Sequence, residues 1–133
     1  MIAQGSDVKI NISVKQNYTN STGRKVTTPV DLNSFQGYLI FLYSKDTNTV
    51  IERYSKNSVT GYEPITVISA TTGQIQINLD KDITTTTPTG WVYGELKTSI
   101  SDADFSLSSY ETVSTFKVDI IVPSVTNGVN PEV

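Results

Sequence analysis

The sequence contains no cysteine and no histidine, and each absence excludes a class of chemistry. Without cysteine there is no disulfide bond and no catalytic thiolate. Without histidine there is no Ser-His or Cys-His catalytic pair, and zinc and haem sites lose their usual ligands. Basic clusters are also missing, because ten Lys and Arg stand against thirteen Asp and Glu and the longest basic run is Arg24-Lys25. Nucleic-acid binding requires clustered cations, so no nucleic-acid partner is expected.

Long apolar runs are missing as well. No stretch approaches the roughly 18 consecutive apolar residues that a membrane-spanning helix needs, so no membrane association is expected. Residues 1–7 have neither the basic region nor the apolar region of a signal peptide. The sequence therefore predicts a protein that folds in a reducing cytoplasm, which the absence of cysteine permits.

What the 133 residues do contain is typical of β-structure. Val (14) and Ile (13) far outnumber Leu (6), Ala (3) and Met (1), and Thr, Ser and Asn supply 19, 15 and 9 residues. β-Branched side chains suit a pleated surface, while Ser and Asn favour turns. The length is that of one domain with a real core.

Short segments with apolar residues at alternate positions are the expected strands. The clearest lie at 8–15, 74–79 and 116–122, whereas 38–43 is apolar in both phases and is interpreted as a central strand covered on both faces. Residues 16–29 are expected to form a long loop or an irregular hairpin. We expect seven to eight strands, no regular helix, and a core made of Val8, Ile10, Ile12, Val14, Leu39, Phe41, Ile75, Ile77, Leu79, Trp91, Phe116, Val118 and Ile120.

Acidic residues offer few candidates for chemistry. Asp80 with Asp82, and Asp102 with Asp104, could supply oxygen ligands to Ca²⁺, but neither pair has the glycine and distal glutamate of a calcium loop, so turn capping is the preferred interpretation. Glu95 lies in an apolar strand and has no second carboxylate with a sequence reason to face it. We therefore expect no catalytic residue, no metal ligand, no cofactor, and no enzyme activity.

Aromatic residues are the remaining candidates for binding. Tyrosine and tryptophan rings near Asn and Asp are typical of carbohydrate-binding faces and also of protein interfaces, although core packing explains several of them equally well. The residues concerned are Tyr18, Tyr38, Tyr43, Tyr54, Tyr62, Trp91, Tyr93 and Tyr110.

Five segments together resemble the small immunoglobulin-like domains of tailed-phage virion proteins, a group that includes the N-terminal domain of baseplate upper proteins and related capsid accessory proteins. They are the alternating strand at 8–15, VDL leading into YLIFLY at 30–43, GQIQINL at 73–79, TGWVYGEL at 89–96 and TVSTFKVDIIV at 112–122. The resemblance covers nearly the whole chain. It implies an antiparallel immunoglobulin-like β-sandwich and a structural role in a virion.

The expected function is that of an auxiliary capsid protein, present in many copies and assembled into the virion in the host cytoplasm. Its partners would be other virion proteins, first the major capsid protein and otherwise fibre or tail proteins. A fibre needs repeats or a coiled coil, and the chain has neither. A tail, baseplate or head-fibre adaptor and a carbohydrate-binding adhesion module remain as alternatives.

The expected organisation is one sandwich at 7–122 with flexible arms at 1–6 and 123–133. The arms carry apolar residues spaced along uncharged segments, which would suit docking onto a neighbouring sheet edge. The loop 16–29 adds an aromatic ring beside two cations. The interface candidates are Ile2, Tyr18, Arg24, Lys25, Val125, Val129 and Val133.

Overall fold

The structure is a computed structural model that describes residues 1–100 and 109–124, without the side chains of residues 16–18, 100 and 109–114. Its strands are β1 (Ile2–Ala3), β2 (Val8–Ser13), β3 (Lys15–Thr19), β4 (Lys25–Pro29), β5 (Gly37–Ser44), β6 (Thr49–Ser55), β7 (Glu63–Pro64), β8 (Thr66–Ser69), β9 (Gln74–Leu79), β10 (Gly90–Ile100) and β11 (Ser109–Val122). Two short helices, η1 (Leu32–Ser34) and α1 (Lys81–Thr86), complete the described elements.

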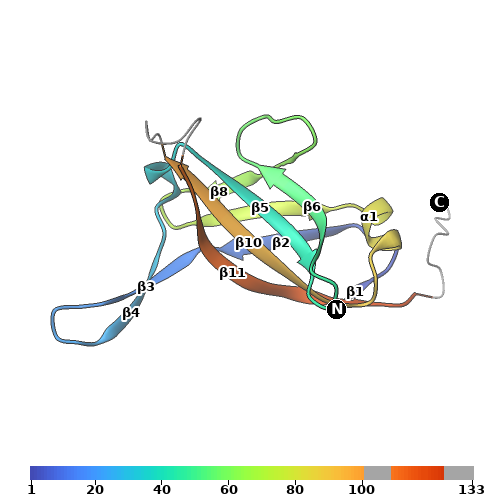
Figure 1. Cartoon of the computed structure of the whole chain (residues 1–133), viewed down its shortest axis with the longest axis horizontal. Coiled ribbons are helices and arrows are strands. Elements are labelled where there is room, and N and C mark those ends of the chain that lie inside the picture. The colour runs from blue at the N-terminus through green and yellow to red at the C-terminus, as the bar shows by residue number, and fades with distance from the viewer. Residues whose placement is uncertain (101–108, 125–133) are drawn as a thin grey trace.

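The strands form two packed sheets and a separate hairpin (Figure 1). Sheet A has the order β1-β11-β10-β5-β6-β7, and sheet B has the order β2-β9-β8. Strands β11-β10-β5-β6 of sheet A correspond to strands G-F-C-C′ of an immunoglobulin-like sandwich, and β2-β9-β8 of sheet B correspond to its strands B-E-D. The predicted all-β fold is therefore confirmed. The described strands outnumber the seven to eight expected because β1 and β7, of two residues each, and the hairpin β3–β4 are added.

The core lies between the two sheets and follows the period-2 alternation of the strands. Among the expected core residues, Ile10, Ile12, Val14, Ile75, Ile77 and Leu79 are buried, and Val8, Phe116 and Val118 are partly buried against them. Gly94 takes a core-facing position on β10, and a Cβ there would collide with the ring of Phe116. The glycine therefore makes room for that ring.

For two central strands, β5 and β10, the prediction of which side chains face the core is wrong. On β5 the fully buried side chains include Ile40 and Leu42, and on β10 they include Val92 and Leu96. Strand alternation then places Leu39, Phe41, Trp91 and, opposite Trp91, Ile120 on the outer face of sheet A. Strand β5 is therefore not covered on both faces by the described residues.

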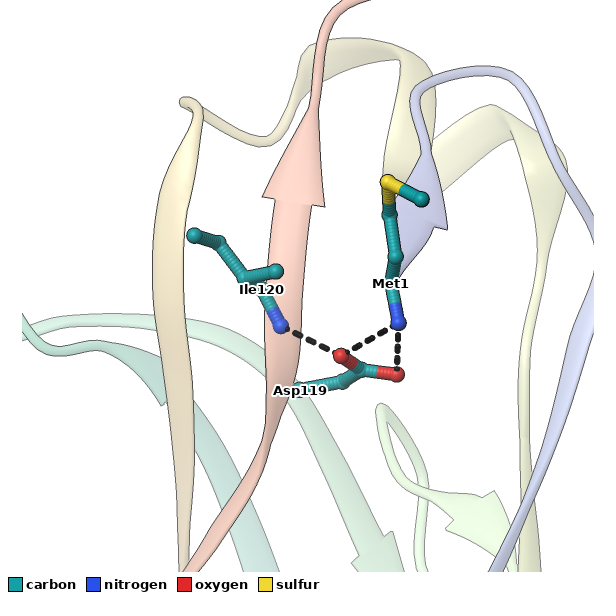
Figure 2. A network of polar contacts seen from close by, with 3 residues as sticks. All are labelled: Met1, Asp119 and Ile120. Carbon is teal, nitrogen blue, oxygen red and sulfur yellow. Dashed lines mark hydrogen bonds and ion pairs between the residues drawn. The ribbon is translucent and has the colours of Figure 1, made fainter.

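The N-terminal segment is part of the sandwich, so the prediction of a free arm at 1–6 is wrong. Strand β1 pairs in parallel with the end of β11, and Ile2 is only 4% exposed. The Met1 ammonium group lies 2.6 and 2.7 Å from the two carboxylate oxygens of Asp119 (Figure 2). The hydroxyl of buried Thr84 donates to the Ser6 carbonyl at 2.8 Å. Apolar burial and these polar contacts together offset the entropy of ordering the segment.

The segment 16–29 lies mainly in a hairpin, β3–β4, which projects from the body of the sandwich (Figure 1). At its turn the Asn20 side-chain oxygen accepts hydrogen bonds from the backbone N–H groups of Thr22 and Arg24. Gly23 adopts a φ of 82°, a left-handed conformation that suits glycine. The hairpin alternative of the sequence analysis is therefore the correct one.

A short helix, α1, lies between β9 and β10. Asp80 caps helix α1 by accepting a hydrogen bond from the Asp82 N–H at 2.9 Å. The expectation of no regular helix is wrong for these six residues, whose length is too small for a helical period to be recognised. No helix in the described part of the chain is long and apolar enough to cross a bilayer.

Candidate binding face

The outer face of sheet A carries a group of aromatic side chains, here called the aromatic face: Phe41, Tyr43, Tyr62, Trp91 and Tyr93. Strands β5 and β10 supply four of them, because their core-facing positions are the even-numbered ones and these rings stand at odd-numbered positions. The pairing of β10 with β5 sets Tyr93 directly opposite Tyr43 and Glu95 opposite Phe41. Two adjacent central strands thus bring the rings together.

The rings contact one another across the strands. Tyr43 and Tyr93 have ring centroids 6.2 Å apart at an interplanar angle of 45°, and Phe41 meets Tyr62 edge-to-face at 6.1 Å and 78°. These separations lie in the range preferred by interacting aromatic pairs. Four of the five rings therefore pack in two pairs on this face.

Lysine side chains cover two of the rings. Lys117 on β11 places its ammonium nitrogen 3.7 Å from the centroid of the Trp91 ring, and Lys45 lies 5.4 Å from that of Tyr93. Both distances allow a cation–π interaction. Exposed Arg53 stands opposite Phe41 on β6. The face is thus rich in cations, although the whole chain has a net charge of −3.

A shallow hollow of about 500 Å³ opens at one side of this face. Asn48, in the turn between β5 and β6, adopts a φ of 52°, a left-handed conformation that asparagine tolerates better than most residues. The hollow offers ring surface, an amide, a carboxylate and an ammonium group to a ligand. Its lining residues are Phe41, Tyr43, Asn48, Val50, Glu95 and Lys97.

The acidic candidates do not gather into a site. Asp80 acts as the cap of α1 and Asp82 lies in the first turn of that helix, while Asp102 and Asp104 lie outside the described residues. Within residues 1–100 and 109–124, no group of three or more acidic side chains is placed to hold a metal ion. Glu95 lies half-buried in the hollow of the aromatic face.

The predicted interface residues fall into three groups. The prediction that Ile2 contacts a neighbouring protein is wrong, because its side chain is buried in the core of its own chain. Arg24 and Lys25 are exposed near the tip of the hairpin, where the backbone of Tyr18 pairs with Val26; the side chain of Tyr18 is outside the described part. The third group, Val125, Val129 and Val133, lies outside the described residues.

The sequence analysis missed the aromatic face by treating Phe41 and Trp91 as core residues. On β10 a signal was available, because Glu95 and Lys97 share the period-2 phase of Trp91, and two charges mark an outward-facing phase. On β5 both phases are apolar, so only the pairing with β10 shows which side faces out. Comparisons with protein-family models, with curated proteins and with solved structures find no match to this chain.

Proposed function

We propose that this protein is a structural component of a tailed-phage virion, an auxiliary capsid protein that attaches to the shell through protein–protein contacts. The virion role rests on the resemblance of its strand motifs to the immunoglobulin-like domains of virion proteins. The mode of attachment rests on the aromatic face. The major capsid protein is the first partner proposed, many copies bind per particle, and assembly takes place in the host cytoplasm.

The observation that carries the attachment surface is the exposure of packed rings beside cations. Trp91, the only tryptophan of the chain, is 39% exposed, and the ammonium group of Lys117 lies over one face of its ring. Tryptophan, tyrosine and arginine are enriched at the centres of protein interfaces. Rings that are already packed against their neighbours lose little conformational freedom on binding, so more of the contact energy appears as affinity.

A tail, baseplate or head-fibre adaptor would use the same face, and only its place in the virion would differ. A carbohydrate-binding adhesion module is the second candidate function. The hollow favours it, because Phe41 and Tyr43 could stack on a sugar ring while Asn48 and Glu95 bond its hydroxyl groups. We rank it second because a neutral sugar has no charge for the cations over Trp91 and Tyr93 to bind.

Fractionation of virus particles produced from the genome that encodes this chain tests the function directly. Mass spectrometry is expected to find the protein in the purified particles at a fixed ratio to the major capsid protein. Its recovery with empty heads separates a capsid protein from a tail or baseplate adaptor, which would follow the tails. Absence from every particle fraction would overturn the virion role.

Binding variants test the attachment face separately. Adding purified Trp91→Ala protein to particles that lack the wild-type chain should reduce co-sedimentation at least tenfold. Ile68→Ala is the matched control, because Ile68 is an exposed apolar residue on sheet B and should leave binding unchanged. Full binding by Trp91→Ala would exclude the aromatic face but not the virion role. Glycan-array binding that Tyr43→Ala abolishes would favour the adhesion module.

A further inference from the structure

Strand β2 leaves one edge of sheet B open along six residues. In the described part of the chain, β9 is the only strand paired with β2. The edges of sheet A are covered only in part, because β1 pairs with two residues of β11 and β7 with two residues of β6. The ladder of β11 carries two register shifts, and β8 has an irregularity between Val67 and Ser69. β2 is therefore a regular six-residue edge that pairs on one side only among the described strands.

The ladder between β2 and β9 determines which backbone groups face that edge. The Val14 N–H donates to the Gly73 carbonyl at 2.8 Å, which fixes 14–73 as a hydrogen-bonded pair. Antiparallel ladders alternate, so Ile10 and Ile12 direct their backbone groups toward β9. The N–H and C=O groups of Lys9, Asn11 and Ser13 consequently point away from β9, toward the open edge.

A cleft of about 240 Å³ adjoins this edge, between β2 and β11. Phe116 and Val118, both only partly buried, line it together with Ile10 and Ile12. The described chain thus leaves both backbone donors and apolar side chains at one side of the sandwich. Strand addition satisfies such an edge with main-chain hydrogen bonds.

We propose that β2 pairs with β2 of a second copy of this chain, antiparallel and centred on Asn11. In this register Asn11 stands opposite its own copy at the two-fold axis as a hydrogen-bonded pair. Lys9 and Ser13 then form hydrogen-bonded pairs with the second copy's Ser13 and Lys9. The two three-stranded B sheets become one sheet of six strands.

The side chains of β2 match themselves in this register. Ile10 lies beside the second copy's Ile12 on the core side, and Lys9 lies beside a serine on the outer side, so no like charges are paired. An isologous contact of this kind closes as a dimer. The pairing edge belongs to sheet B and the aromatic rings belong to sheet A, and the proposal stands independently of the proposed function.

Single-cysteine variants test the register, because the chain has no cysteine of its own. A hydrogen-bonded antiparallel pair has Cα atoms about 5.5 Å apart, within disulfide range, so Asn11→Cys is expected to form a covalent dimer under mild oxidation. Lys9→Cys alone should not, because its two copies would lie about 14 Å apart. A mixture of Lys9→Cys and Ser13→Cys should form the mixed dimer.

Sedimentation equilibrium tests the backbone contact. A single strand pair buries less than the roughly 1,200–2,000 Å² of a standard interface, so the wild-type dimer is expected to dissociate on dilution. Asn11→Pro removes an edge N–H that points away from β9, the one described strand paired with β2, and it should raise the dissociation constant at least tenfold. Asn11→Ala keeps that N–H and is the matched control, expected to dimerise like the wild type.

Three outcomes would overturn the proposal. The first is a wild-type protein that stays monomeric at every concentration, and the second is cross-linking that is equal at positions 9 and 11. The third is tighter dimerisation of a chain that ends at Ser124, because residues 125–133 would then cover the edge in the full chain. Circular dichroism of Asn11→Pro separates lost pairing from lost folding, and the cysteine variants decide the register in either case.

Discussion

The ammonium nitrogen of Lys117 lies 3.7 Å from the centroid of the Trp91 ring, with the lysine on β11 and the indole on β10. Replacing the cation by Lys117→Met should lower the free energy of unfolding by about 0.5–1 kcal/mol, the size of a cation–π contact at an exposed site. Urea denaturation followed by the fluorescence of the single tryptophan measures this, and the folded-state emission should also change. Lys25→Met, in the hairpin, is the control and should alter neither quantity.

The hydroxyl of Tyr54 links the two sheets, because it leaves β6 and donates to the Asn78 carbonyl on β9 at 2.6 Å. The Tyr54 side chain is fully buried. Tyr54→Phe removes the donor and leaves the Asn78 carbonyl without this hydrogen bond, so the free energy of unfolding should fall by about 1–3 kcal/mol. A smaller change than in Ser13→Ala, an exposed position on β2, would contradict this role.

Alkaline stability should depend on the same side chain. Burial, with the nearby carboxylates of Glu52 and Glu63, raises the pKa of Tyr54 above its usual value of 10.0. A raised folded-state pKa gives stability that is complete below pH 10 and is lost as the pH rises from there toward the folded-state value. Denaturation at pH 9, 10 and 11 should therefore show a steeper loss for the wild type than for Tyr54→Phe. Parallel profiles would contradict the assignment.

Truncations in the core and on the outer face of sheet A should differ in their cost to stability. Ile77→Ala removes a side chain that is 1% exposed and should cost about 2–5 kcal/mol in the free energy of unfolding. Phe41→Ala removes a larger side chain from the outer face and should cost less than Ile77→Ala. Equal or reversed costs in urea denaturation would mean that Phe41 belongs to a packed core after all.

The contact between the N-terminus and β11 should give the protein a sensitivity to acid. The Met1 ammonium group hydrogen-bonds the Asp119 carboxylate and holds its pKa below the usual value, although burial acts in the opposite direction. A lowered folded-state pKa gives stability that is present above the unfolded-state pKa and is lost as the pH falls through the folded-state value. Asp119→Asn should therefore destabilise the protein at pH 7, and the difference from the wild type should shrink as the pH falls below the usual carboxylate pKa.

Acetylation of the N-terminal amine provides a second way to break the same contact. It removes the charge and leaves the Asp119 side chain in place, so it should lower stability in the same direction as Asp119→Asn. The two changes together should cost no more than either alone. Because the Met1 side of the pair is exposed, 0.5 M salt should reduce the effect. Additive costs would show that the two groups act separately.

Strands with one polar phase could be predicted from the sequence, and strands without one could not. β2 and β9 alternate cleanly, so their positions and their buried residues follow from the pattern. β5 is apolar in both phases, and its inner side depends on pairing with β10, which no local pattern contains. The two-residue strand β1 is too short for any period, and Ile2 is buried only because a distant strand lies beside it.

The candidate site was the least predictable part, because it depends on which side of a sheet faces water. Aromatic residues satisfy a core and an interface equally well, and the charges of Glu95 and Lys97 were the only local indication of the difference. The cation over Trp91 comes from β11, 26 residues further along the chain, and the ring against Phe41 comes from the segment before β7. Both contacts are products of the topology.

The alternation along β5 and β10 separates two kinds of selective pressure. Even-numbered positions such as Ile40 and Leu96 face the core, and odd-numbered positions such as Tyr43 and Tyr93 face outward, where the proposed binding takes place. A library that randomises the odd set while holding the even set constant should return many folded proteins with altered recognition. A change of binding partner at this face would then need no change in the interior.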